Sequence, residues 1–153
     1  MRHHHLNIAF RTRGGRAPGK ELGLGHVYRC INLSYFLKRN KLFFLLEDFG
    51  GARKIVRENG IKKILSLKPE INLKLDIQQT VAFIHTNKID VLIIDSYKVK
   101  PRYLAEVKKY VKVVLISDLR NIDYSADLVV NGFIGFDNQT LINKYGSKCL
   151  LGP

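Results

Sequence analysis

Short apolar runs along this chain alternate with longer segments in which apolar residues recur every three or four positions. The short runs predict strands and the periodic segments predict helices. The expected strands cover residues 6–10, 41–46, 61–67, 91–94 and 113–116, with two further short candidates at 128–130 and 148–151. The expected helices cover residues 26–40, 51–59, 73–87 and 101–110.

The order of these elements predicts the fold class. The runs 91–94 and 113–116 are continuously apolar, which is typical of strands buried on both faces of a parallel sheet. Strand and helix alternate along most of the chain, and this arrangement favours a Rossmann-like, doubly wound parallel sheet in a single α/β domain. Residues 12–25 are rich in Gly, Arg and Pro, so we expect a loop there.

Composition and charge narrow the function classes. With 153 residues, 46% apolar and 25% charged, the chain is long enough for one domain with a core, and its apolar runs are too short to span a membrane. The net charge is +13, and residues 1–68 carry 15 basic against 4 acidic side chains. This basic half would attract phosphorylated ligands, nucleic acid or an acidic partner.

No interleaved aromatic residues or recognition motif accompany the charge, so we do not expect a nucleic-acid binder. Two cysteines form no disulfide framework, which favours a reducing cytoplasmic compartment.

The glycine-rich segment after the first strand is one candidate site. Gly14 and Gly15 follow that strand, and Gly23 and Gly25 lead directly to His26 at the expected start of a helix. Glycines permit close backbone approach, and the free N–H groups of a helix start favour an anion. The spacing is not that of the dinucleotide-binding motif, and a flexible strand-to-helix turn is the alternative interpretation.

Polar residues follow two of the later strands. Asp95 ends one apolar run, with Tyr97 behind it, and Asp118 follows the next run. Ligands of open parallel sheets bind at the carboxyl ends of the strands, so these carboxylates could orient a histidine, bind a hydroxyl or act as a base. Either aspartate could equally cap the next element. Arg29 lies three residues after His26, on the same side of the expected helix.

Several blocks of the sequence resemble a known family. Residues 11–15 (Arg-Thr-Arg-Gly-Gly) and 23–30 (Gly-Leu-Gly-His-Val-Tyr-Arg-Cys) are similar to the opening of the UDP-sugar hydrolases of pseudaminic acid biosynthesis and the related spore coat polysaccharide biosynthesis proteins. The later blocks 90–97, 113–119 and 150–153 follow in the same order. This chain has Asp95-Ser96-Tyr97 where the family often has Asp-His-Tyr, and Ser117-Asp118 where it often has two aspartates.

The resemblance implies a two-domain, glycosyltransferase-B-like protein. Its N-terminal half carries a catalytic histidine, which maps to His26, and its C-terminal half binds most of the nucleotide. The family's hydrolases release UDP from a diacetamido-trideoxy-hexose by attack of water at the anomeric carbon. We therefore expect residues 1–153 to form a single N-terminal domain, inactive alone, whose C-terminal nucleotide-binding domain is missing from this chain.

The expected site follows from the strand ends and the resemblance together. We expect His26 and Asp95 to be catalytic, with a nucleotide sugar as the substrate. The expected substrate-binding residues are Arg13, Gly14, Gly15, Gly25, Tyr28, Arg29, Tyr97 and Asp118. We expect no cofactor and no metal, because the histidine tract 3–5 is typical of a tag remnant or a disordered terminus. The alternative is a non-catalytic α/β module that docks an acidic partner or nucleic acid on its basic face.

Overall fold

The computed structural model describes residues 5–119, 122–132 and 141–152. The strands are β1 (Asn7–Ala17), β2 (Lys20–Gly23), β3 (Lys41–Asp48), β4 (Ile64–Leu67), β5 (Val91–Asp95), β6 (Lys112–Ser117), β7 (Leu128–Asn131), β8 (Leu141–Ile142) and β9 (Lys148–Leu151). The helices are α1 (Gly25–Phe36), α2 (Ala52–Glu58), α3 (Leu73–Asn87) and α4 (Pro101–Val107). None of the helices described here is long and apolar enough to cross a membrane.

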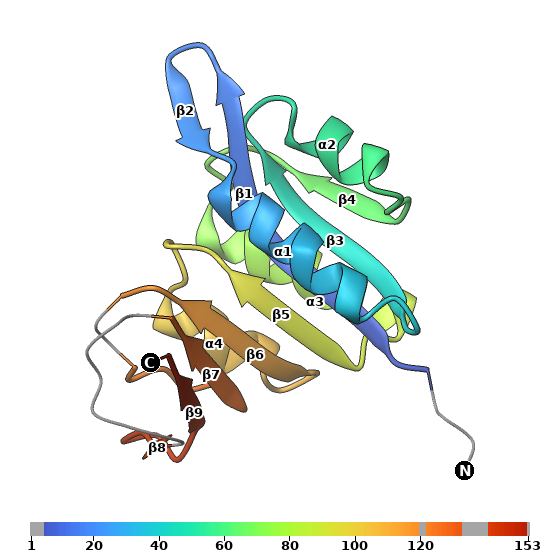
Figure 1. The fold of residues 1–153 in the computed structure, drawn as a ribbon. Coiled ribbons are helices and arrows are strands. Elements are labelled where there is room, and N and C mark those ends of the chain that lie inside the picture. Colours follow the sequence, from blue (N-terminus) through green and yellow to red (C-terminus); the bar gives the residue numbers. More distant parts are fainter. Residues whose placement is uncertain (1–4, 120–121, 133–140, 153) are drawn as a thin grey trace.

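The sheet confirms the predicted Rossmann-like, doubly wound class. Its strands lie in the order β4-β3-β1-β5-β6-β7-β9-β8 (Figure 1). Pairing is parallel from β4 to β9, whereas β8 is antiparallel to β9 and β2 is antiparallel to β1. The order of the first six parallel strands reverses direction between β1 and β5, and this switch point is where such sheets bind ligands.

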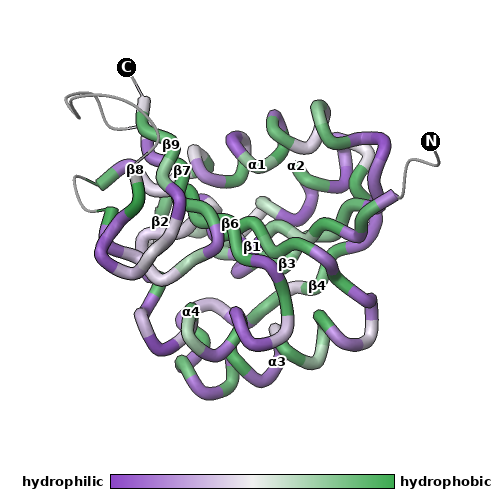
Figure 2. The backbone as a smooth tube through the Cα atoms, turned by 90° about the horizontal axis from the view of Figure 1, so that it is seen from below, coloured by the Kyte–Doolittle hydropathy of each residue, from purple (hydrophilic) through white to green (hydrophobic). Residues whose placement is uncertain are grey.

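Helices cover both faces of the sheet. Figure 2 shows its largely hydrophobic strands between α1 and α2 on one side and α3 and α4 on the other. Alternation along β1 divides the core accordingly, because successive side chains of a strand point to opposite faces. Ile8 and Phe10 pack in the cluster that contains Val27 of α1, while Ala9 packs in the cluster that contains Leu104 of α4. The same alternation decides which face each polar residue of the site joins.

The prediction of a loop over residues 12–25 was wrong. β1 continues to Ala17, and the chain turns at Pro18-Gly19 into β2, so most of this segment is a β-hairpin that projects beyond the rest of the sheet (Figure 1). Gly19 has a φ of +75°, which a type II turn with proline before glycine requires. β1 is longer than predicted because Arg11 and Arg13 are buried beside carboxylates from elements distant in the sequence. The remaining helices and strands match the expected segments with small shifts at their ends, and β8 was not predicted.

Candidate active site at the strand switch point

His26 and Asp95 meet at the switch point of the sheet. Asp95 is the last residue of β5 and pairs in register with Thr12 of β1, so it stands at the carboxyl end of the strand next to the reversal. His26 is the second residue of α1, which begins where the hairpin returns to the sheet. Asp95 lies on the same face of β5 as Ile93, which packs in the α1 cluster. Two residues separated by 69 positions are thereby brought into contact.

The contact between His26 and Asp95 orients the imidazole ring. Nδ1 of His26 lies 2.6 Å from Oδ1 of Asp95. An ionised carboxylate only accepts hydrogen bonds. Nδ1 of His26 therefore carries a proton and donates a hydrogen bond to Asp95. In the neutral ring the other nitrogen, Nε2, then holds a lone pair. Nε2 is buried and has no hydrogen-bond partner within the described part of the chain.

Arg29 neutralises this pair. Its Nε and Nη2 atoms each lie 2.6 Å from an oxygen of Asp95, and its Nη1 lies 2.5 Å from Oδ1 of Asp118. The Asp95 side chain is only 1% exposed, whereas those of Arg29 and Asp118 are 35% and 39% exposed. Burial alone would raise the pKa of the Asp95 carboxyl, but hydrogen bonds from Arg29 and His26 outweigh burial and hold that pKa below its ordinary value. The bonds to Asp95 raise the pKa of Arg29, which therefore remains charged.

Tyr97 covers the imidazole on the loop that follows β5. Its ring meets the His26 ring edge-on, with 4.1 Å between the centroids and 80° between the planes. Tyr97 is itself 65% exposed, so few contacts hold it in this position. Together with Arg29 and Asp118, these two rings border a hollow of about 230 Å³ that reaches Gly25 at the start of α1.

The glycines of the first segment divide into two kinds. A Cβ atom on Gly15 would lie 2.3 Å from the carbonyl carbon of Phe49, and one on Gly14 would lie 2.8 Å from the carbonyl oxygen of Gly23. These two glycines therefore permit close approach of the chain to itself. Gly25, by contrast, has open space where a Cβ would stand, and it borders the hollow beside His26. Among residues 5–119, 122–132 and 141–152, no side chain caps the N-terminus of α1.

The structure separates two other expected site residues from His26. Arg13 points to the opposite face of the sheet, where it is 5% exposed and contacts Glu47 and Glu70. Tyr28 is 46% exposed on α1. It lines neither the hollow described above nor a second, smaller hollow of about 20 Å³ that also borders His26. The expected residues that come together are His26, Arg29, Asp95, Tyr97 and Asp118.

Sequence reasoning missed a charged cluster on the far face of β1. Arg11 contacts Glu47 of β3 and Asp76 of α3, and all three side chains are largely buried. The available signal was the alternation in Arg11-Thr12-Arg13, which places both arginines on one side of an extended strand. Cys30 lies beside the candidate site, with Sγ 3.9 Å from Asp95. Burial raises the pKa of its thiol and makes a thiolate nucleophile unfavourable.

The fold and the site define a doubly wound α/β protein with a histidine–aspartate pair at its switch point. Comparison with known proteins found a relative. The chain is 30% identical over 161 aligned residues to the uncharacterized protein MJ1062 of Methanocaldococcus jannaschii. The alignment covers 95% of this chain and 31% of that protein, so the chain spans about a third of the length of its relative. No family model matches the chain, and no solved structure matches it significantly. Within the described residues, no group of three or more His, Cys, Asp or Glu side chains is arranged to hold a metal ion.

Proposed function

We propose that this chain is the catalytic, N-terminal part of an enzyme that cleaves a nucleotide sugar, with a UDP-sugar as the substrate and surface polysaccharide or sialic-acid-like sugar biosynthesis as the setting. The resemblance of the blocks around residues 11–15 and 23–30 suggests the substrate class. The observation that carries the proposal is the 2.6 Å contact between Nδ1 of His26 and Asp95, which leaves Nε2 unpartnered at the strand switch point. A general base requires an oriented ring whose second nitrogen is not already hydrogen-bonded, and His26 meets both conditions.

The proposed reaction follows from that lone pair. Nε2 of His26 takes a proton from a water molecule, whose oxygen attacks the anomeric carbon of the sugar. The bond from this carbon to the phosphate oxygen breaks, and UDP leaves with the bonding electrons. Asp95 remains ionised and stabilises the imidazolium that forms, which is the role of the carboxylate in catalytic triads. If a sugar hydroxyl replaces the water, the same base supports glycosyl transfer.

The surroundings of the pair fit an anionic substrate. The N-terminus of α1 has no side-chain cap, and its first turn borders the hollow that contains His26. Free N–H groups at a helix start stabilise phosphate through hydrogen bonds and the helix dipole. Arg29 is already held by Asp95 and Asp118, so we assign it the positioning of Asp95 rather than a direct hold on phosphate.

The remainder of the nucleotide site is expected outside this chain. One wall of a cleft supplies limited affinity, because association must offset the loss of translational and rotational freedom. Residues 1–153 alone should therefore bind UDP weakly and turn over little substrate. Calorimetric titration with UDP tests this part, and a dissociation constant in the low micromolar range, about 8 kcal/mol, would show that the nucleotide is held here instead.

The test of function uses the complete protein encoded by the gene. UDP release from UDP-N-acetylhexosamines is measured for the wild type, for His26→Asn and for His85→Asn. His85 is the matched control, since it lies on α3 in contact with Tyr110. Loss of a general base should lower kcat by about 100-fold or more with little change in KM. A wild-type protein that releases no UDP, or a His26→Asn variant that keeps most of its kcat, would refute the proposal.

A further inference from the structure

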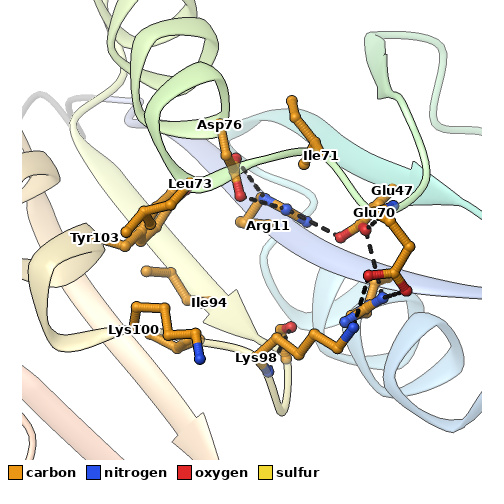
Figure 3. A pocket seen from close by; sticks show the side chains of 13 residues that line it. Arg11, Glu47, Glu70, Ile71, Leu73, Asp76, Ile94, Lys98, Lys100 and Tyr103 are labelled. Carbon is orange, nitrogen blue, oxygen red and sulfur yellow. Dashed lines mark hydrogen bonds and ion pairs between the residues drawn. The ribbon is translucent and has the colours of Figure 1, made fainter.

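A cavity of about 110 Å³ lies on the α3 and α4 side of the sheet. It opens at the same switch point as His26 but on the opposite face, beside the side chain of Arg11 (Figure 3). Arg13 also lines it. Ser96 and Val99, in the loop between β5 and α4, line both this cavity and the second, smaller hollow of about 20 Å³ beside His26. The loop therefore separates two pockets at one edge of the sheet.

The acceptor groups of the cavity are occupied. Asp76 accepts hydrogen bonds from Nε and Nη2 of Arg11 at 3.4 and 2.8 Å, and from the hydroxyl of Thr80. Glu47 accepts from Arg11, from Arg13 and from the backbone N–H of Glu70, the last at 2.8 Å. Two buried arginines and two carboxylates thus balance one another. A cationic ligand would find no free carboxylate among these buried groups.

The donor groups of the cavity are only partly used. Arg13 is only 5% exposed. Its Nε atom is buried and has no hydrogen-bond partner among the described residues. The Nη2 atom of Arg13 makes two long contacts, at 3.4 Å to Glu47 and 3.3 Å to Glu70. The ammonium group of Lys100, which also lines the cavity, forms no ion pair with any described residue. A buried guanidinium N–H without an acceptor is costly unless a ligand satisfies it.

The remaining charged groups lie towards the solvent. Glu70 and Lys98 form an ion pair of 2.7 Å, and their side chains are 56% and 57% exposed. This pair links the loop before α3 to the loop before α4 across the cavity (Figure 3). Counting all of its charged lining, the cavity has four basic and three acidic side chains, so one negative charge would neutralise it. Apolar groups complete the wall, contributed by Ile71, Leu73, Ile94, Val99 and the ring of Tyr103.

From this arrangement we infer that the cavity is a binding site for a small organic anion, a carboxylate or a phosphate monoester with a short apolar body. The anionic group accepts hydrogen bonds from Nε of Arg13 and from Lys100, and the apolar body contacts Ile71 and Leu73. A cavity of about 110 Å³ suits a small acid. The site is separate from the proposed hydrolysis, and it does not depend on it.

Nuclear magnetic resonance of the 15N-labelled chain tests this site directly, because the Nε–H group of each arginine gives its own signal. Pyruvate and methyl phosphate are the two probes, and inorganic phosphate is the anion without an apolar body. We expect a saturable shift of the Arg13 Nε–H signal with pyruvate or methyl phosphate, weaker with inorganic phosphate, and no shift of the Arg11 signal. Whichever organic probe binds more tightly identifies the ligand class.

Variants distinguish specific binding in the cavity from a general attraction of anions to a basic protein. Lys100→Met should weaken binding about fivefold, the effect of one partly exposed charge. Arg102→Met is the matched control, since Arg102 lies two residues further along α4 and does not line the cavity, and it should leave binding unchanged. His26→Asn should also leave it unchanged. The inference is overturned if neither organic probe shifts the Arg13 signal at concentrations up to about 10 mM, or if Lys100→Met and Arg102→Met weaken binding equally.

Discussion

The two faces of the sheet carry the same kinds of side chain at the switch point but use them in opposite ways. On the α1 face, an arginine and a histidine share one buried carboxylate, and Nε2 of the histidine has no partner in the described part of the chain. On the α3 and α4 face, two arginines share two buried carboxylates, and Nε of Arg13 has no acceptor among the residues that the structure describes. The first arrangement favours proton abstraction, and the second favours holding an anion. Composition alone would not distinguish them, since both sets contain arginine beside Asp or Glu.

The difference arises from the elements that supply the arginines. Arg29 extends from a helix and is about a third exposed, so it reaches both the buried Asp95 and the exposed Asp118. Arg11 extends from a central strand, and its guanidinium is enclosed between β3 and α3. Solvent therefore screens one cluster more than the other. The consequences for stability should differ in the same direction.

Arg11→Met should have the largest effect, because it breaks the enclosed cluster. The substitution leaves the largely buried Asp76 without its main partner and removes one of the three donors to Glu47. Removing one member of a buried ion pair destabilises a protein by about 3–5 kcal/mol. Urea denaturation followed by circular dichroism measures the loss. A loss below about 1 kcal/mol would show that water already reaches these carboxylates and that the cluster is not enclosed.

Arg29→Met should have a smaller effect of about 1–2 kcal/mol, because the guanidinium is partly exposed and His26 remains as a partner of Asp95. The same denaturation experiment compares the two arginines directly. If Arg29→Met destabilises the protein as much as Arg11→Met, then the α1 face depends on its ion pairs as strongly as the opposite face does.

Local sequence patterns could predict the parallel sheet but not the pairing of its charges. The continuously apolar strands 91–94 and 113–116 identified the fold, because full burial requires such runs. The carboxyl-end rule directed attention to Asp95 and His26, which the structure places in contact. Arg13, in contrast, was expected beside the substrate of His26, whereas it lies on the other face. Residues 12–17 were predicted to be a loop, but they belong to β1. In a strand, the side chain of Arg13 points to the face opposite that of Thr12 and Gly14.

Acid should reduce the stability that Asp95 contributes on the α1 face, and this effect should be smaller than that of either arginine substitution. The pKa of Asp95 is lower in the folded protein than the value of about 3.9 in an unfolded chain. Its ionisation therefore contributes stability that is complete above this unfolded value and is lost as the pH falls through the lower, folded value. Asp95→Asn removes the contribution, so the difference in unfolding free energy between wild type and variant should shrink between about pH 4 and pH 2. A difference that stays constant over this range would contradict the role of Asp95 as a stabilised anion.

Tyr97→Ala should produce the smallest change in stability and the most specific change in reactivity. The Tyr97 side chain is mostly exposed, and substitutions at such positions usually alter stability by no more than about 0.5 kcal/mol. Its ring packs edge-on against His26, whose Nε2 is buried. Removing the ring should uncover Nε2 and accelerate acylation of His26 by diethyl pyrocarbonate several-fold, as measured by peptide mass spectrometry. His85 provides the internal reference, because its own ring contact is with Tyr110. If the acylation rate of His26 relative to His85 is unchanged, then Tyr97 does not control access to the lone pair, and substrate must reach the open nitrogen of the α1 face by displacing another group.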